Sequence, residues 1–276
     1  QGAGLKVGEG VIDLADNEII FEPLGWVKEE TSKANTNFKL VFDDNNIHVN
    51  DIVFSSENMN SELQLTYDGE RASRLYIKEL EMQGHDFSGL FEWDYENAMY
   101  QVSVKGDEFN AVPLMDIIFA PLDENAEKTD LPDFNLSGSI AEVAMYNDII
   151  AKETSVLAGY INNEVIDFGY MAKWGEDKNL SLIIASDEDL SNPEQKMTLN
   201  TNDGGNALRA LDFFTSGDRG NLLIDADMIK MEKGYTLKGN IRAEEFTVAD
   251  SQVFSELLKE KEFAKAQEEL DAKNNN

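Results

Sequence analysis

The sequence contains no cysteine, two histidines and five prolines, and it is poor in basic residues. Without cysteine it has no disulfides, which fits either a reducing compartment or a disulfide-free periplasmic protein. A zinc site or a nucleophilic triad would have to be assembled around His48 or His85. Both histidines sit among Asn or Asp, with no glycine-framed serine nearby. The sequence therefore argues against this chemistry.

Long apolar runs are also missing. No stretch approaches the roughly 20 apolar residues that a membrane-spanning helix needs, and no signal peptide opens the chain. Residues 1–4 (QGAG) carry no initiator methionine, so we expect an excised piece of a longer protein. The absence of targeting signals from this piece then says little about where the whole protein is located.

Positive charge is scarce, since 54 acidic residues face 23 basic ones and the formal net charge is −31. Such a field repels phosphate, which argues against nucleic-acid binding. It also argues against docking on anionic lipid surfaces. A solvated outer surface or an adaptation to salt explains the charge more simply.

What the sequence does have is a succession of short strands separated by turns, beginning near residue 5 and recurring about every 10–15 residues. Residues 11–14 and 18–21 flank an Asp16-Asn17 turn and predict a hairpin. A change of phase near Asn50-Asp51 predicts a β-bulge. We therefore expect a mainly β protein, with one long antiparallel meander curled into an elongated groove, short helices and a C-terminal helix.

The clearest predicted strand pair runs from Phe87 to Val104. Its alternation puts aromatic residues on one face and acidic residues on the other, as in an antiparallel sheet with one covered side. The aromatic stripe comprises Phe91, Trp93 and Tyr95, with Tyr100 and Val102 on the returning strand. Ile166, Phe168 and Tyr170 share a face later in the chain.

Three segments interrupt the strand rhythm. Leu114, Ile117 and Ile118 have helical spacing, so residues 110–120 predict a short helix lying against the sheet. The acidic, proline-flanked residues 121–133 predict a loop and a candidate internal boundary of a domain spanning 1–250. Residues 251–276 predict a helix whose first turns are apolar and whose end is frayed.

Local clusters could suggest ion binding, but each has a simpler explanation. Asp43-Asp44, Asp123-Glu124 and Asp187-Glu188-Asp189 do not match the spacing of a calcium loop. Gly204-Gly205 could present free amides to an anion, yet the longer phosphate-binding motifs are absent, and a tight strand-to-helix turn explains the pair. We therefore expect no metal, no cofactor and no catalytic residues.

Residues 199–258 carry the most distinctive pattern. It reads as a strand, a short helix capped by Asn202 or Asp203, a glycine turn at 216–220, two strands and a closing helix. The order N-D-G-G-x-A-L-R-A-L, glycine turn, two strands and E-E-F-T-V-x-D-S-Q-V-F-S-E-L-L resembles the C-terminal region of the AsmA-like proteins, the long YhdP-type members in particular. Residues 23–26 (PLGW), 82–87 (MQGHDF) and 109–114 (FNAVPL) fit the same resemblance more loosely.

The resemblance implies a fold and a role. AsmA-like proteins belong to the repeating β-groove group, which includes TamB. They are inner-membrane-anchored envelope proteins of Gram-negative bacteria whose periplasmic apolar groove is implicated in phospholipid movement toward the outer membrane. This chain would be the end of such a groove, located in the periplasm and lacking its anchor, with phospholipid and the two membranes or their proteins as partners. Its acidity departs from the family and argues against a charge-based attraction to headgroups.

The resemblance also assigns residues. The predicted groove lining is Phe91, Trp93, Tyr95, Val102, Phe168 and Tyr170. The predicted groove end is formed by Phe254, Leu257 and Leu258 of the last helix. Alternation alone does not say which face is inside. Two other functions remain open. One is a closed-core structural or adhesive acidic β-domain, with or without stabilisation by calcium. The other is a glycan hydrolase using paired carboxylates, for which Asp and Glu are abundant but no distinguishing motif is present.

Overall fold

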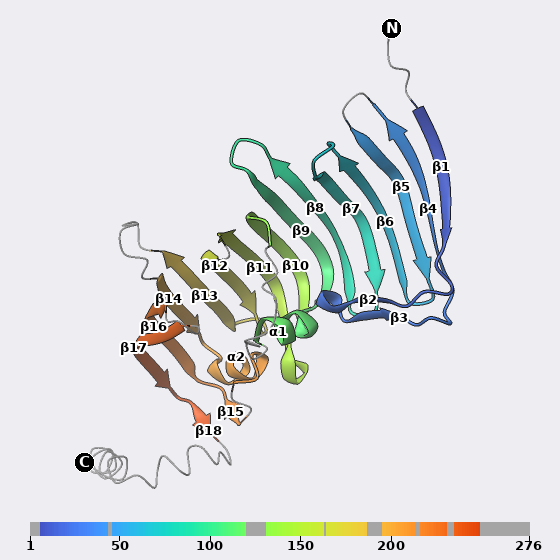
Figure 1. The fold of residues 1–276 in the computed structure, drawn as a ribbon. Helices are drawn as coiled ribbons and strands as arrows, with labels where there is room; N and C mark the ends of the chain where they lie inside the picture. The colour runs from blue at the N-terminus through green and yellow to red at the C-terminus, as the bar shows by residue number, and fades with distance from the viewer. Residues whose placement is uncertain are drawn as a thin grey trace, which may run out of the picture.

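The computed structural model describes residues 6–43, 46–119, 131–162, 164–186, 195–213, 216–230 and 235–248. Most of them belong to one sheet of 14 strands (Figure 1). In spatial order these are β1 (Lys6–Asp13), β4 (Ala34–Phe42), β5 (Ile47–Ser56), β6 (Met59–Tyr67), β7 (Ala72–Met82), β8 (His85–Asp94), β9 (Met99–Asn110), β10 (Phe134–Ala144), β11 (Ile150–Ile161), β12 (Glu164–Lys173), β13 (Asn179–Ser186), β14 (Gln195–Thr201), β16 (Asn221–Lys230) and β17 (Tyr235–Glu244).

The sheet is an antiparallel meander with one exception. Neighbouring strands follow one another along the chain, with a small hairpin at residues 19–28 inserted between β1 and β4 and with a short helix and strand at residues 204–218 inserted between β14 and β16. All of these pairs are antiparallel except β9 and β10, which are parallel. A parallel pair needs a crossover connection, and this one contains α1 (Val112–Phe119). The sheet begins at β1 and ends at β17 without closing into a barrel, which confirms the predicted mainly β, open meander.

The remaining elements are short and gather near one end of the strands (Figure 1). They are the hairpin of β2 (Ile19–Phe21) and β3 (Trp26–Lys28) with the 3-10 turn η1 (Glu22–Leu24) between them, α1, the 3-10 turn η2 (Tyr146–Asp148) and α2 (Gly204–Ala210). We call these elements the cover. A further small pair, β15 (Gly217–Asp218) and β18 (Thr247–Val248), lies beside α2.

The core lies between the cover and one face of the sheet. Leu24, Trp26 and Met115 from the cover form one cluster with sheet residues that include Leu80, Phe87 and Ile140. A second cluster joins Ala207 of α2 to Leu180, Leu199 and Leu222. We call this face of the sheet the inner face, and the strand ends at which the cover packs the closed end.

Several local predictions are confirmed. The register shifts between Val49 and Ile52, and Asp51 has a positive φ, so the predicted bulge exists. The helix at 112–119 lies against the sheet, although its buried residue is Met115, and Ile117 is 46% exposed. Asp203 caps α2 and accepts a hydrogen bond from the backbone N–H of Asn206.

The predicted hairpin around Asp16-Asn17 is wrong. β1 pairs with β4 along its whole length, and β2 pairs with β3 instead. Lys28 provides a reason, since its buried Nζ donates to the backbone carbonyls of Ala15, Asn17 and Glu29, at 3.2, 2.7 and 2.9 Å. These bonds hold the 15–17 turn against β3 rather than leaving it at the tip of a two-stranded ribbon.

Two further predictions concern chain organisation. The candidate boundary at 121–133 falls largely outside the described residues, and the sheet is continuous through β9 and β10 on either side of it. The predicted C-terminal helix, with Phe254, Leu257 and Leu258, lies outside the described residues. Among the helices that are described, none has the length and apolar character needed to cross a membrane.

Candidate functional site: an apolar band on the inner face

An unbroken row of apolar side chains crosses the inner face. Directly opposed residues on paired strands point to the same side of a sheet, so the register aligns one residue from each strand between β4 and β16. This middle row is Leu40, Val49, Leu65, Leu75, Phe91, Val102, Leu136, Ala158, Phe168, Ile184, Met197 and Ala226. No polar residue interrupts it.

A second row lies two residues nearer the closed end. This lower row is Leu63, Ile77, Gly89, Val104, Gly138, Val156, Tyr170, Leu182, Leu199 and Ile224. Several of its members, including Ile77, Val104 and Tyr170, pack against the buried clusters beneath the cover. The lower row therefore marks how far the cover reaches across the sheet.

A third row lies two residues beyond the middle row, toward the opposite strand ends. Trp93, Tyr100, Phe134 and Tyr160 are paired in register on four adjacent strands, and we call them the aromatic row. The Trp93 and Tyr100 rings meet edge to face, with centroids 5.0 Å apart. The Phe134 and Tyr160 rings stack at 5.1 Å. Arg71 lies over the Trp93 ring at 4.2 Å, within the range of a cation–π contact.

The middle row is half-buried from Leu40 on β4 to Met197 on β14, and only its last member, Ala226, is buried. Phe91, Val102 and Phe168 are half-buried and belong to neither buried cluster. Among the described residues, then, the apolar surface between the lower row and the aromatic row has no covering layer. We call this surface the open band. Contiguous apolar surface of this kind marks a binding site more often than a free surface.

The six residues predicted as lining do not all lie in the open band. Phe91, Val102 and Phe168 are in the middle row, and Trp93 is in the aromatic row. Tyr170 is in the lower row, where burial raises the pKa of its hydroxyl. Tyr95 lies beyond the end of β8, is 68% exposed and donates a 2.5 Å hydrogen bond to Asp68. That bond and backbone N–H donors lower the pKa of Asp68 to about 2.

Most of the middle row was not predicted as lining. Leu65, Leu75, Leu136 and Ile184 alternate with polar residues as clearly as Phe91 does, but they are not aromatic. The available signal was the position of the turns, which fixes which residues of successive strands become neighbours. Aligning the alternating segments on their turns would have found them.

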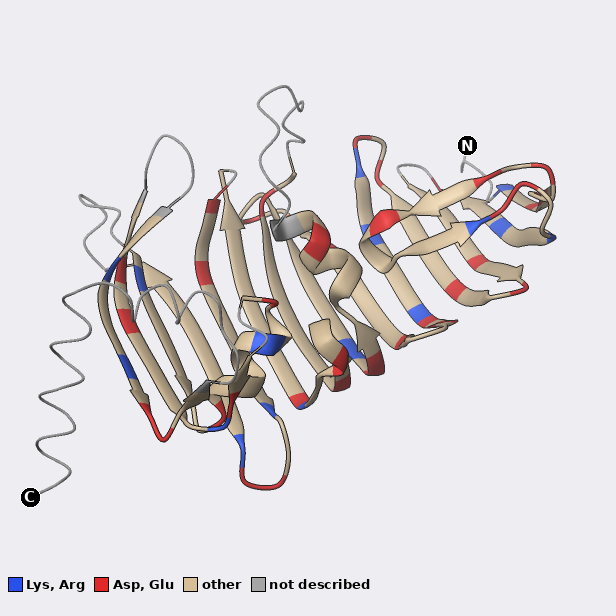
Figure 2. Ribbon diagram, turned by 90° about the horizontal axis from the view of Figure 1, so that it is seen from below, with Lys and Arg blue, Asp and Glu red and all other residues tan. Residues whose placement is uncertain are grey.

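The opposite, outer face is more polar but not uniformly so. It carries Glu92, Gln101 and Lys105, together with Leu157, which is 60% exposed. Two shallow pockets on this face are lined in part by Leu90, Ser103 and Ser137. Figure 2 shows acidic and basic residues at many strand ends and turns, with long uncharged stretches of strand between them.

The histidines have structural surroundings. His48 lies between Thr66 and Asp43, with ring nitrogens 3.2 and 3.0 Å from their side-chain oxygens. His85 was expected in a turn, but it is the first residue of β8, and it is 1% exposed against Phe109 at the closed end. Its burial lowers the pKa of the imidazole, an effect partly offset by the Leu24 backbone. Across the described ranges, no three His, Asp or Glu side chains are grouped so that they could hold a metal ion.

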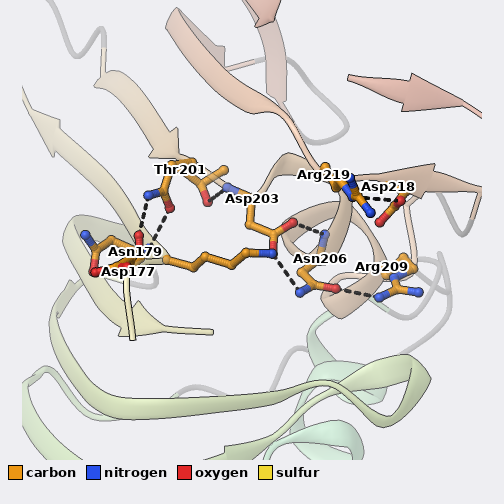
Figure 3. Close-up of polar contacts among 10 residues, drawn as sticks. Asp177, Asn179, Thr201, Asp203, Asn206, Arg209, Asp218 and Arg219 are labelled. Atoms are coloured by element: carbon orange, nitrogen blue, oxygen red, sulfur yellow. Dashed lines mark hydrogen bonds and ion pairs between the residues drawn. The ribbon is translucent and has the colours of Figure 1, made fainter. Parts of the chain in front are cut away.

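The motif that carries the resemblance also has a structural role (Figure 3). The buried Asp203 carboxylate accepts from Lys178 Nζ at 2.6 Å and from Asn206 Nδ2 at 2.8 Å. The amides of Gly204 and Gly205 donate to the carbonyls of Gly220 and Arg219, at 2.7 and 3.1 Å. These amides are therefore occupied, which supports the strand-to-helix turn rather than an anion cradle.

Comparisons with family models, curated proteins and solved structures found no match to this chain.

Proposed function

We propose that this chain is a non-enzymatic lipid carrier that holds phospholipid acyl chains against the open band, as a segment of an AsmA-like envelope protein. The observation that carries the proposal is the middle row, which is apolar on every strand from β4 to β16 and lies outside both buried clusters. Burying apolar surface stabilises a complex by roughly 25 cal/mol per Å². Hydrocarbon tails are the ligand that matches a long band without polar groups.

The aromatic row supports an orientation for the lipid. Tyrosine and tryptophan favour the boundary between hydrocarbon and water, because each has an apolar ring and a polar tip. Tyr100 shows this arrangement, since its hydroxyl donates to the carbonyl of Ala72 at 2.9 Å while its ring packs on Trp93. Tails would lie on the middle row and headgroups in water beyond the aromatic row. Location between the two membranes of an envelope follows from the sequence resemblance.

The alternative of a closed-core structural domain requires the inner face to be sealed by protein. The sheet does not close into a barrel, and the described cover reaches only the lower row. Native mass spectrometry of the protein purified from cells separates the two functions. Phospholipid adducts support the carrier, whereas a bare mass with calcium adducts supports the alternative.

A matched pair of variants tests which face is used. Val102 is in the middle row and Ser103 is its exposed neighbour on the outer face, so Val102→Glu and Ser103→Glu place the same charge on opposite sides of β9. A carboxylate in a hydrocarbon environment costs about 3 kcal/mol, or roughly 100-fold in affinity. We expect lipid loading to be lost in the first variant and kept in the second.

Circular dichroism checks that both variants fold. If Val102→Glu does not fold, Phe168→Glu on β12 replaces it as the middle-row variant. Equal lipid loading in the unmodified protein, the folded middle-row variant and Ser103→Glu would exclude the open band as the binding surface.

A further inference from the structure

The open band has a definite depth along the strands. On β9 it extends from Val104, which packs against the buried cluster, to Tyr100 in the aromatic row. Four residues of extended chain span about 14 Å. One leaflet of a bilayer contributes about 15 Å of hydrocarbon, half of the roughly 30 Å core. The band is therefore about as deep as a single layer of lipid tails.

The two limits of the band differ chemically. At the closed end the lower row meets Trp26, Met115 and other cover residues in a packed cluster, so a tail end cannot advance further without displacing protein. At the other limit the aromatic row is followed by Asp94, the last residue of β8, while Asp68 lies in the nearby turn between β6 and β7. Hydrogen bonds lower the pKa of both carboxyl groups and so keep them ionised. A hydrocarbon tail can therefore be buried between these two limits, but it cannot extend past either of them, because packed protein blocks one and charged carboxylates lie at the other.

From this geometry we infer that tails lie parallel to the strands, with their methyl ends at the closed end, and that the depth of the open band selects tail length. The inference rests on the proposed lipid-binding function but adds a property that the function does not require. Tails lying across the strands, along the length of the sheet, would meet no such limit, because the middle row continues from β4 to β16.

Gly89 offers a direct way to change the depth. It is the lower-row residue of β8, and a Cβ built there would meet Ser103 O, Phe91 Cε2 and Ile77 Cδ1 at 3.4, 3.7 and 3.8 Å, which are ordinary contact distances. Larger side chains at position 89 would therefore project into the band above the packed cluster. Gly89→Leu and Gly89→Phe should shorten the band in two steps.

The test measures the affinity of the intact chain for monomeric lysophosphatidylcholines of increasing tail length, by titration calorimetry below the micelle concentration. We expect the affinity to rise about four-fold for each methylene that reaches apolar protein, and then to level off at the tail whose extended length matches the band. In Gly89→Leu the plateau should come at a shorter tail, and in Gly89→Phe at a shorter one still. Ser103→Phe, on the outer face, should leave it unchanged.

Two results would overturn the inference in distinguishable ways. If the affinity keeps rising up to the longest tails and is unchanged by substitutions at position 89, the chain binds lipid but its open band does not select tail length. The proposed function then stands and the inference fails. If no tail length gives saturable binding, the proposed function and the selection of tail length both fail. Gly89→Leu, the smaller change, keeps the comparison available if Gly89→Phe does not fold.

Discussion

Replacing Asp203 should show how the most distinctive sequence motif stabilises the fold. In Asp203→Ala the first turn of α2 loses its cap, typically worth about 1 kcal/mol. It also loses the charged hydrogen bond from Asn206 Nδ2, worth about 1.5 kcal/mol. Lys178 is 47% exposed, so its ion pair adds less than about 1 kcal/mol. We expect a total near 3 kcal/mol.

Asp203→Asn separates these contributions. The asparagine oxygen can still accept from the backbone N–H of Asn206, so the cap is kept, while the contacts of the second oxygen are lost. We expect a cost of about 2 kcal/mol, two-thirds of that in the alanine variant, because only the cap's contribution of about 1 kcal/mol is kept. Asp218→Ala is the control, because its ion pair with Arg219 (Figure 3) joins two exposed side chains at 3.4 Å and should contribute under about 0.5 kcal/mol.

Urea unfolding measures all three variants, with an unchanged m-value as the sign that only stability has altered. Asp203→Ala within about 0.5 kcal/mol of the unmodified protein would refute the structural role. Equal losses in Asp203→Ala and Asp203→Asn would instead assign the whole effect to the ion pair and the side-chain amide.

The remaining predictions concern the closed end. His85 is buried, and its burial places the pKa of the imidazole below the ordinary value of 6.5. Near pH 6.5 the unfolded chain therefore binds a proton that the folded chain does not, so the free energy of unfolding should fall as the pH drops from about 7.5 through 6.5. His85→Leu should flatten this part of the pH profile, and an unchanged slope would show that another group causes it. Lys28→Met removes the donor for three backbone carbonyls and should cost about 3 kcal/mol locally, seen as faster hydrogen exchange over residues 15–29. The exposed Lys33→Met is its control, and equal exchange in both variants would contradict the proposed anchoring.

Local pattern predicted much of this fold because period-two alternation and turn residues act over short distances. The bulge at Asn50-Asp51, the α1 segment and the Asp203 cap are all decided by neighbours in sequence. The pairing of β1 with β4 is not, because residues 11–21 satisfy the rules of a hairpin equally well. Long-range contacts, including those of Lys28, decide between the two arrangements.

Burial of polar side chains escaped prediction for a related reason. Lys28 follows Trp26 and Val27 as an alternating strand residue, and nothing local indicates that three carbonyls surround its ammonium group. His85 lies beside a Gly84 turn and reads as exposed, yet Leu24 and Phe109 enclose it from distant parts of the chain. The apolar rows were predictable in composition, but their continuity across the sheet depends on a register that the sequence does not state.

The central claim is that hydrocarbon occupies the open band, and photocrosslinking tests it most directly. A phospholipid with a diazirine in mid-tail would be bound to the purified protein, activated by light, and its attachment sites mapped by mass spectrometry. We predict labels on middle-row residues, with Phe91, Val102 and Phe168 among them. Labels confined to outer-face residues such as Leu157, or no attachment above that of a soluble control diazirine, would contradict the account.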